Sequence, residues 1–277
     1  MSRSLTGRVW RRCQKLFRRI PRLTRLPFGA LWLARDDELS QAIGKVGFEE
    51  AECRFVERFL RSGMTVLDLG AHHGLYTLLA SRGVARGGRV IAFEPSNRER
   101  RALRMNILVN RCANVSVQGF ALGSADAETE FYVVQAHSTG CNSLRPPARD
   151  IEGETRKQRV RTVRLDGWLA SHKVRQVDFV KLDVEGGELE ALKGAADLLE
   201  RQPRPVILVE VQDARTEPWG YKAKEIIEHL KQKGYKWFRP SSDGYVEELD
   251  TTAEFFDGNF VACPEESVGM LRSQLYA

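Results

Sequence analysis

Residues 65–74 read TVLDLGAHHG, an apolar stretch that ends in an acid and leads into two glycines four residues apart. The pattern predicts a buried parallel strand that turns sharply into a helix. Gly70 and Gly74 would let the backbone pass close to a ligand, because a Cβ atom at either residue would block the approach. The segment therefore predicts a ligand-binding α/β sheet.

Two acids at predicted strand ends indicate which ligand this turn holds. Asp68 ends the first strand, where a carboxylate would repel a pyrophosphate but attract the ammonium and sulfonium charges of S-adenosylmethionine. His72 stands where the dinucleotide fingerprint GxGxxG requires its second glycine. The next strand, RVIAF, leads into Glu94, which lies about 24 residues after Gly70, where a ribose diol would be held. These features predict an S-adenosylmethionine site, and the alternative is a chance glycine-rich turn in another α/β protein.

The composition limits both the architecture and the partners. With 277 residues and 42% hydrophobic content, the chain is long enough for one large α/β domain and an accessory segment. Nine basic residues and no acid fall within residues 1–25, and removing them from the net charge of +6 leaves about −3 for the rest. The body therefore lacks the charge of a nucleic-acid-binding surface. We expect residues 1–47 to form a basic arm and lead-in segment and residues 48–277 to form the ligand-binding domain.

Two interpretations of the basic arm compete. Its apolar residues Trp10, Leu16, Phe17 and Ile20 are interleaved with arginines, as in a basic amphipathic helix that lies on an anionic membrane. The favoured interpretation is a disordered basic tail. The sequence has no convincing secretory signal and no apolar run of about 18 residues, and its five cysteines contain no CxxC pair. We therefore expect a cytoplasmic protein, with peripheral membrane contact through residues 1–25 as the alternative.

Hydrophobic periodicity predicts strands and helices that alternate along the chain after a helix over residues 48–60. The expected elements are strand 64–69, helix 74–82, strand 89–94, helix 97–110, strand 115–119, strand 176–183, helix 187–200 with a break at Gly194, strand 204–211 and helix 221–233. This order predicts a mostly parallel sheet with helices on both faces. Short strands at 235–239, 245–249 and 259–262 predict an antiparallel edge.

An insertion over residues 120–175 interrupts this alternation. It contains two short strand patterns, at 130–135 and 159–164. An ordered insertion of this length between two sheet strands is usually functional, so we expect it to form part of the substrate wall. The highly charged stretch 148–158 is expected to be a mobile surface loop.

A second group of acids follows two further apolar strands. VDFVKLD ends in Asp183 and VILVE ends in Glu210, so both acids stand at the carboxyl ends of predicted strands. Ligands of open α/β sheets bind at that edge, and we expect the two carboxylates to face one cleft from adjacent strands. Glu185 follows Asp183 closely, whereas Glu188 is expected to cap the next helix, where the macrodipole favours negative charge.

Six segments, in chain order, carry a resemblance to a known family: LDLGAHHGLYT, IAFEP, FALGS, TGCNSL, VDFVKLDVEGGELEALKGA and PVILVEV. Together they resemble the FkbM family of S-adenosylmethionine-dependent methyltransferases, over residues 50–262. The resemblance implies an α/β class I methyltransferase fold, Rossmann-like, with a mostly parallel seven-stranded sheet and an antiparallel edge. It also implies transfer of a methyl group to a hydroxyl of a sugar, glycolipid or related natural product. The alternatives are a methyltransferase for a polyketide or other small-molecule hydroxyl and a non-catalytic binding protein with the same fold.

The resemblance further implies roles for individual residues. It places Asp68, Gly70 and Gly74 around the methionine part of the cofactor, Glu94 on the ribose, and Ala121 and Leu122 near the adenine. His72 is assigned to the cofactor site as well, although the family usually has a small or polar residue at His72 or His73. Asp183 and Glu185 then line the reacting end. Together with Glu210 they are the catalytic candidates, and the residues assigned to the acceptor are Asn142, Ser143 and His137.

An aliphatic hydroxyl is a poor nucleophile, so methyl transfer to it needs a base or a metal. In the favoured scheme a side chain accepts the proton directly, and the candidates are Asp183, Glu185, Glu210, His73 and His137. In the other scheme Asp183, with Glu210 or Asp213, holds a divalent cation that lowers the pKa of the hydroxyl. The expected partner is a small-molecule or glycan hydroxyl acceptor, and no nucleic acid is expected.

Overall fold

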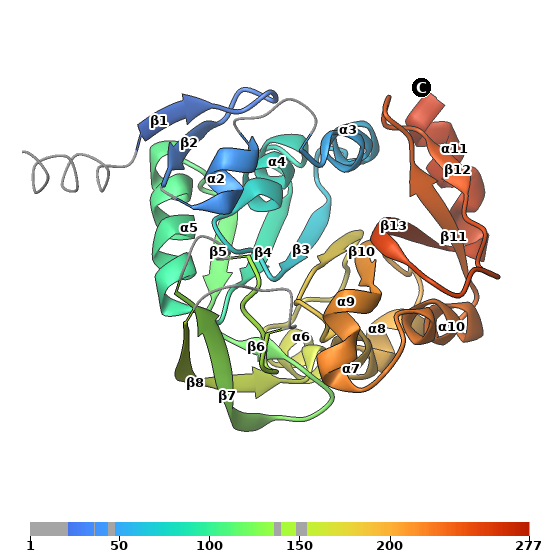
Figure 1. Ribbon diagram of the computed structural model, residues 1–277. Helices are drawn as coiled ribbons and strands as arrows, with labels where there is room; N and C mark the ends of the chain where they lie inside the picture. Colours follow the sequence, from blue (N-terminus) through green and yellow to red (C-terminus); the bar gives the residue numbers. More distant parts are fainter. Residues whose placement is uncertain (1–21, 36, 44–47, 136–139, 148–153, 277) are drawn as a thin grey trace, which may run out of the picture.

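The computed structural model describes residues 22–35, 37–43, 48–135, 140–147 and 154–276 (Figure 1). In this part of the chain the largest sheet has eight strands. Their order across the sheet is β12 (Val246–Glu248), β11 (Tyr235–Pro240), β13 (Asp257–Pro264), β10 (Val206–Gln212), β9 (Phe179–Leu182), β3 (Thr65–Leu69), β4 (Arg89–Phe93) and β5 (Val115–Gln118). The strands from β10 to β5 are parallel, and β13, β11 and β12 form an antiparallel edge. The predicted class I fold is confirmed, and β12, the strand expected at 245–249, makes one strand more than the seven that the resemblance implies.

Helices cover both faces of this sheet (Figure 1). They are α2 (Glu38–Ile43), α3 (Glu50–Phe59), α4 (Leu75–Gly83), α5 (Asn97–Val109), α6 (Leu165–Ser171), α7 (Glu188–Lys193), α8 (Ala196–Glu200), α9 (Asp213–Thr216), α10 (Lys224–Gln232), α11 (Val268–Tyr276) and the 3-10 turns η1 (Glu217–Trp219) and η2 (Glu265–Ser267). One core joins the sheet to α6, α7, α8 and α10, and the opposite face packs against α3, α4, α5 and α11. Every helix within the described ranges is too short or too polar to span a bilayer.

The central strands supply both cores through their alternating side chains. In β10, Ile207 and Val209 belong to the core under α7 and α10, whereas Val206 and Leu208 belong to the core under α3 and α4. Successive residues of a strand point to opposite faces, and a parallel sheet covered on both faces needs apolar residues on each. This requirement explains why the central strands read as nearly continuous apolar runs.

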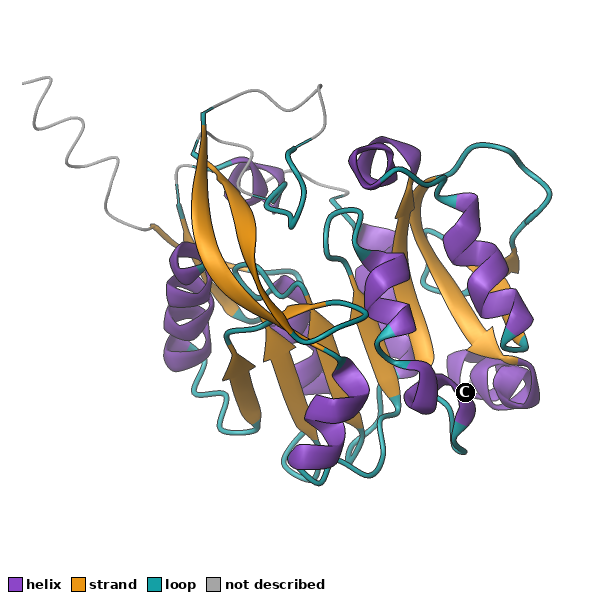
Figure 2. Ribbon diagram, turned by 90° about the horizontal axis from the view of Figure 1, so that it is seen from below, coloured by secondary structure: helices purple, strands orange, loops and turns teal. Residues whose placement is uncertain are grey.

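The insertion between β5 and β9 forms a separate curved sheet beside the main one (Figure 2). Its order is β6 (Ala121–Leu122), β8 (Thr155–Val163) and β7 (Ala127–Val134), and β7 pairs with β8 over eight residues. The expectation of a mobile loop at 148–158 is wrong for residues 155–158, because their backbone pairs with residues 131–134 of β7 and so continues the ladder of β8. Residues 148–153 lie outside the described residues.

Part of the lead-in segment packs against the domain as a hairpin of β1 (Arg22–Arg25) and β2 (Leu31–Ala34). The side chains of Asn106 on α5 and Asn110, which follows the helix, accept hydrogen bonds from the backbone of β2, at 2.9 and 2.8 Å. Trp32, between these contacts, is fully buried. The amides thus satisfy backbone groups at an exposed strand edge. The remainder of the basic arm, residues 1–21, lies outside the described residues.

Candidate active site

A cavity of about 200 Å³ opens at the carboxyl ends of the parallel strands. Its walls include the four acids expected there, Asp68 of β3, Glu94 after β4, Asp183 after β9 and Glu210 of β10. The insertion closes the far wall with residues such as Phe131 of β7. The structure therefore brings the predicted cofactor acids and the predicted catalytic acids into one cavity, as the strand-end rule requires.

Asp68 lies at the inner end of the cavity and is 2% exposed. Its carboxylate accepts a hydrogen bond from the hydroxyl of Thr77 on α4. Burial raises the pKa of Asp68 to about 6, although the Thr77 hydrogen bond and the nearby Lys181 act in the opposite direction. The hydrogen bond from Thr77 and the charge of Lys181 compensate only part of the hydration that the Asp68 carboxylate loses on burial. A cationic ligand would supply the missing stabilisation of its negative charge.

The glycines of the first turn have a packing role in addition to the ligand approach expected for them. Gly70 has φ +89°, and a Cβ atom there would lie 1.6 Å from the carbonyl oxygen of Asp183. Gly74 has φ +98°, and a Cβ atom there would lie 2.5 Å from Cδ1 of Leu103. Both residues need the left-handed region, which glycine enters at no steric cost. They allow the loops after β3 and β9 and the helix α5 to approach, and of the two only Gly70 lines the described part of the cavity.

Glu94 is held by the backbone at both carboxylate oxygens. The backbone N–H of His72 donates to Oε2 at 2.8 Å and that of Ser96 donates to Oε1 at 2.7 Å. These bonds fix the carboxylate at the cavity wall, where its remaining lone pairs can accept hydroxyl hydrogens. Burial raises the pKa of Glu94 to about 8, with a further contribution from Glu99. The geometry is suited to a neutral diol such as a ribose.

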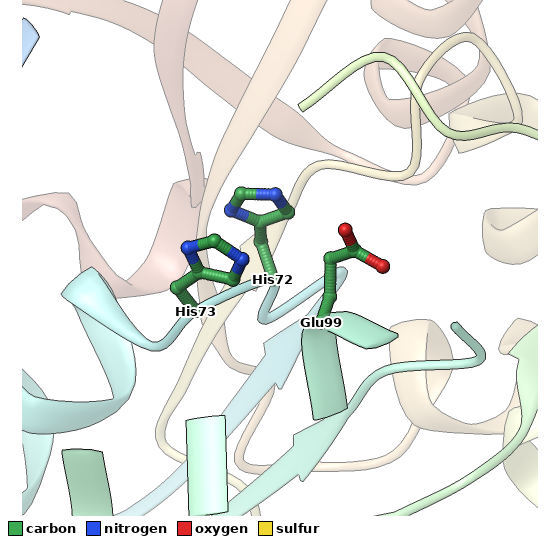
Figure 3. Close-up of side chains that lie close together, drawn as sticks. All are labelled: His72, His73 and Glu99. Carbon is green, nitrogen blue, oxygen red and sulfur yellow. The ribbon is translucent and has the colours of Figure 1, made fainter. Parts of the chain in front are cut away.

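His72 lines the cavity, as expected, and His73 and Glu99 lie close to it (Figure 3). Their rings stack with centroids 4.0 Å apart, and His72 has a left-handed backbone with φ 48°. Burial lowers the pKa of His73 far below its usual range, so its ring is neutral beside Asp37. Potential ligand atoms of the three residues lie within 4.8 Å of one another. The carboxylate of Glu99, however, already accepts hydrogen bonds from Ser96 and Arg98, which leaves it poorly suited to a metal.

The predicted catalytic acids form a cluster at the other end of the cavity. Oxygens of Asp183, Glu185 and Glu210 lie within 4.8 Å of one another. β9 and β10 are adjacent and parallel, which confirms that Asp183 and Glu210 face one cleft from neighbouring strands. Burial, and then the charge of Asp183, raise the pKa of both Glu185 and Glu210 well above the usual range. Oε2 of Glu210 is buried and has no hydrogen-bond partner among the described residues.

A buried lysine of β9 neutralises part of this charge. Nζ of Lys181 donates to Asp183 at 3.1 Å and to the amide oxygen of Asn259 at 2.8 Å. Burial alone would lower the pKa of Lys181, but the carboxylates of Asp183, Glu49 and Glu210 outweigh this effect and raise it. The ammonium also lies 5.1 Å from the ring centre of Tyr76, on the face of the sheet that packs against α4. Lys181 is therefore a permanent cation beside the acids.

The sequence of this α/β domain matches one known family. The family model described as "Methyltransferase FkbM domain" matches residues 68–237. The chain belongs to the FkbM methyltransferase family. It accordingly carries a methyltransferase domain of the class that uses S-adenosylmethionine. The side chains of the cavity also fit S-adenosylmethionine independently of the family match. Asp68 offers a buried carboxylate to its cationic charge, and Glu94 offers a fixed carboxylate to its ribose diol.

Several known proteins are similar to this FkbM chain. The AMB antimetabolite synthetase AmbE of Pseudomonas aeruginosa is 27% identical over 248 residues, which are 74% of this chain and 12% of that protein. Methyltransferase FkbM from Methylobacillus flagellatus has 17% identity, covers 73% of this chain and 44% of that one, and has a TM-score of 0.43. An O-methyltransferase from Bacillus cereus in complex with SAH has 15% identity, covers 79% of this chain and 81% of that one, and has a TM-score of 0.45. The chain thus spans about an eighth of the curated relative that it matches.

The other predicted site residues of the FkbM chain fall at different distances from the cavity. Ala121, Leu122 and Asn142 line it. Ser143 is not among the described residues that line the cavity. Its hydroxyl donates to the backbone carbonyl oxygen of Glu185 at 2.7 Å and so helps to fix the backbone of this catalytic candidate. His137 lies outside the described residues.

Two further acids have structural roles. Glu188 at the start of α7 accepts the backbone N–H groups of Val184 and Gly186, at 2.9 and 3.3 Å, so it holds the loop before the helix and does not form the helix cap expected for it. Both oxygens of Asp213 accept backbone N–H groups, from Ala223 at 3.1 Å and from Phe256 at 2.9 Å. The metal scheme that used Asp213 is therefore disfavoured, because these bonds occupy the carboxylate.

Sequence reasoning missed Lys181 and the residues that hold Glu185. Glu185 has φ 56°, its carbonyl accepts from Nε1 of Trp219 at 3.3 Å, and Nε of Arg215 lies 3.3 Å from its Oε2. A signal for Lys181 was present, because a lysine in the otherwise apolar run VDFVKLD must be buried and paired. The partners of Glu185 follow β10 in the chain, and no local pattern connects them to the loop after β9.

Proposed function

We propose that this FkbM methyltransferase transfers a methyl group to a hydroxyl of a sugar, a glycolipid or a related natural product. The observation that carries the proposal is the cluster of Asp183, Glu185 and Glu210 at the cavity end away from the ribose acid, with the pKa of Glu185 and Glu210 raised by burial. A hydroxyl acceptor must lose a proton, and a buried carboxylate with a raised pKa is, in its ionised form, a stronger proton acceptor than an exposed one.

The cofactor supplies the methyl group, already activated on a sulfonium. The protein has to hold the hydroxyl about 3 Å from the methyl carbon and remove its proton. Glu210 is the favoured acceptor of the proton, because it lines the cavity and its buried Oε2 has no hydrogen-bond partner in the described chain. Asp183, fixed by Lys181 at 3.1 Å, is placed to hold the hydroxyl. Glu185, paired with Arg215, completes the wall.

Direct proton transfer is supported over the metal scheme by the charges around the cluster. Lys181 and Arg215 lie against Asp183 and Glu185, at 3.1 and 3.3 Å, and reduce the negative potential that would attract a divalent cation. A metal at Asp183, Glu185 and Glu210 would also have to compete with these ion pairs. Chelation decides between the schemes, because only a metal-dependent enzyme loses activity in EDTA and regains it with Mg²⁺ or Mn²⁺.

The test is turnover of labelled S-adenosylmethionine by Asp183→Asn and Glu210→Gln variants. We expect at least one of them to lower turnover by about 100-fold or more, with cofactor affinity within a few-fold of wild type. The matched control is Glu228→Gln, which removes an acid from a surface pair with Lys231 and should leave turnover unchanged. Full activity in both variants would show that the chemistry lies on other residues.

The acceptor class is tested by measuring methyl transfer from labelled S-adenosylmethionine to a panel of candidate acceptors. It contains free glycans, lipid-linked glycans and macrolide-like lactones with free hydroxyls. A natural-product acceptor is the second candidate, because the curated relative AmbE is described as an antimetabolite synthetase. Methylation of only the lactones would select that candidate. Cofactor binding without methylation of any hydroxyl would instead favour the non-catalytic alternative.

A further inference from the structure

A second hollow of about 530 Å³ lies next to the cofactor cavity, between the start of α5 and the sheet of the insertion. Arg98 and Arg101 of α5, Arg156 and Lys157 of β8, and Arg35 after β2 line it. Among the described residues that line this hollow there is no acid. We call it the basic pocket. Five cations around one hollow repel one another, and an anionic ligand would relieve that repulsion.

Three of these cations are available to a ligand. Lys157 pairs with Glu130 at 2.7 Å and Arg98 with Glu99 at 2.5 Å. Within the described chain no carboxylate forms an ion pair with Arg35, Arg101 or Arg156, and all three are exposed. The body outside the basic arm has a small negative net charge, so this concentration of arginines is local and not a general property of the surface.

The walls of the basic pocket are fixed by contacts between its elements. Gln158 of β8 donates to the carbonyl oxygen of Pro95 at 3.0 Å and accepts from the backbone N–H of Asn97 at 3.3 Å. Arg98 also donates to the carbonyl oxygen of Val134 at 2.9 Å. These bonds join β7 and β8 to the first turn of α5. The basic pocket is therefore preorganised, which reduces the entropy lost when a ligand binds.

The chemistry of the basic pocket fits a phosphate. Arginine guanidinium groups match phosphate oxygens in a bidentate geometry. α5 has 13 residues and begins at Asn97, and Ser96 and Asn97 line the pocket, so the positive end of the helix dipole adds to the cations. The volume of about 530 Å³ is large enough for a diphosphate and part of the group attached to it.

The basic pocket is a neighbour of the cofactor cavity. Phe131 of β7 lines the cavity and Val133 lines the pocket, and two residues along a strand span about 7 Å. The backbone N–H of Ser96, another pocket residue, donates to the ribose acid Glu94 at 2.7 Å. An acceptor with a phosphate in the pocket can therefore extend toward the cavity along the insertion.

We propose that the basic pocket binds a phosphate or diphosphate group carried by the acceptor. The inference rests on the proposed function and narrows its acceptor to a phosphorylated one, such as a nucleotide-diphosphate sugar or a lipid-diphosphate sugar. The phosphate anchors the acceptor while its hydroxyl reaches the acids of the cavity. Arg101 and Arg156 are positioned to carry most of the contact.

The first test is calorimetric titration of the full-length protein with inorganic pyrophosphate. The double variant Arg101→Gln/Arg156→Gln should weaken binding about tenfold or more, the range for losing charge-assisted contacts. The control is Arg104→Gln/Arg159→Gln, which removes exposed arginines from the same helix and strand but outside the described pocket lining. It should stay within about twofold of wild type. All four substitutions are at exposed residues, and unchanged thermal unfolding confirms that both variants fold.

The second test separates the source of the phosphate. UDP-glucose and farnesyl diphosphate are titrated in parallel, and tighter binding of one than of pyrophosphate assigns the nucleotide or the lipid class. Equal affinity for sulfate and pyrophosphate, or equal loss in both double variants, would overturn the proposal. So would a single-stranded RNA oligonucleotide that binds more tightly than the three diphosphates and shows the same dependence on Arg101 and Arg156.

These outcomes are distinct from failure of the proposed function. Pyrophosphate binding that depends on Arg101 and Arg156, without methyl transfer to any hydroxyl, would support the pocket and refute O-methylation. With an active acceptor, the double variant Arg101→Gln/Arg156→Gln should raise KM about tenfold while kcat stays within about twofold. The dephosphorylated acceptor should show no difference between this variant and wild type.

Discussion

Single residues in the cofactor cavity determine how cofactor binding depends on pH. Without a ligand, burial raises the pKa of Asp68 to about 6 and that of Glu94 to about 8. A cation favours the ionised form of Asp68, so binding releases a proton wherever this group is protonated. We expect the Kd of S-adenosylmethionine to fall as the pH rises from about 5 to about 8. Calorimetry in buffers of different ionisation enthalpy measures the proton released.

Substitutions at these two acids test the cofactor assignment. Asp68→Asn and Glu94→Ala should each weaken S-adenosylmethionine binding by about 1–3 kcal/mol, the range for a hydrogen bond to a charged group. Asp68→Asn should also remove the part of the pH dependence centred near 6. The surface substitution Asp250→Asn is the control. Wild-type affinity in both cavity variants would remove the cofactor site from this end of the sheet.

The buried acid Glu210 should lower the stability of the ligand-free protein at high pH. Its pKa is raised in the folded state, so the unfolded chain binds fewer protons above about pH 4.5 and stability falls as the pH rises. Glu210→Gln removes this effect. We expect it to raise Tm by about 2–6 °C at pH 8, which corresponds to 1–2 kcal/mol, and by much less at pH 5. Equal Tm shifts at the two pH values would contradict the assignment.

At the scale of single residues, the sequence predicted the acids well and their surroundings poorly. Asp68, Glu94, Asp183 and Glu210 follow from one rule, because parallel strands that end in an acid place it at the same edge of the sheet. The role of Gly70 did not follow, since the group that excludes a Cβ atom there is the carbonyl of Asp183, more than a hundred residues later. Such contacts depend on strand order, which single segments do not encode.

Among the elements, the loop after β3 gives a sharp test of packing. Gly70→Ala places a Cβ atom 1.6 Å from the Asp183 carbonyl and forces a positive φ. We expect a loss of stability of more than about 3 kcal/mol, since neither backbone can move freely. Gly167→Ala in α6 is the matched control, because nothing lies within 4 Å of the added Cβ atom. It should leave the free energy of unfolding unchanged or raise it by up to about 1 kcal/mol.

Helices and strands whose apolar residues recur at regular spacing were predicted from the sequence. Elements that are stabilised by contacts with distant parts of the chain were not. α5 and β3 to β5 lie within a few residues of their predicted limits, because their apolar spacing is regular. β1, β2 and α6 were missed. Their sequences are short and mixed, and their stability comes from burial of Trp32 and Trp168 and from the asparagines of α5. Tertiary packing overrides weak local propensity in such segments.

At the scale of the whole molecule, positive charge is concentrated in the N-terminal arm and in the basic pocket. The sequence of residues 1–25 is strongly basic, while the body is slightly acidic apart from the basic pocket. We propose that the arm brings the protein to an anionic membrane, at about 1 kcal/mol per basic residue near the surface. The division into an arm and lead-in segment, residues 1–47, and a domain, residues 48–277, is part of the same proposal, although β1 and β2 pack against the domain.

Sedimentation with vesicles tests the role of the arm. Full-length protein should sediment with phosphatidylserine vesicles at low salt, and a variant without residues 1–21 should not. This deletion keeps the β1–β2 hairpin, so the folded body is retained. Phosphatidylcholine vesicles are the control for charge. Equal sedimentation of the two proteins would show that the arm does not direct membrane contact.

The order of strands in the sheet also affects how the protein is made. β13 is translated after β11 and β12, yet it lies between β10 and β11 in the sheet. Until residues 257–264 leave the ribosome, β10 has an unpaired edge and β11 has no link to the sheet. A nascent chain with apolar, unpaired edges is prone to aggregate. The strand translated last, β13, is thus the one that joins β11 and β12 to the rest of the sheet. A premature stop codon before residue 257 would produce a fragment with an unpaired β10 edge, which is prone to aggregate.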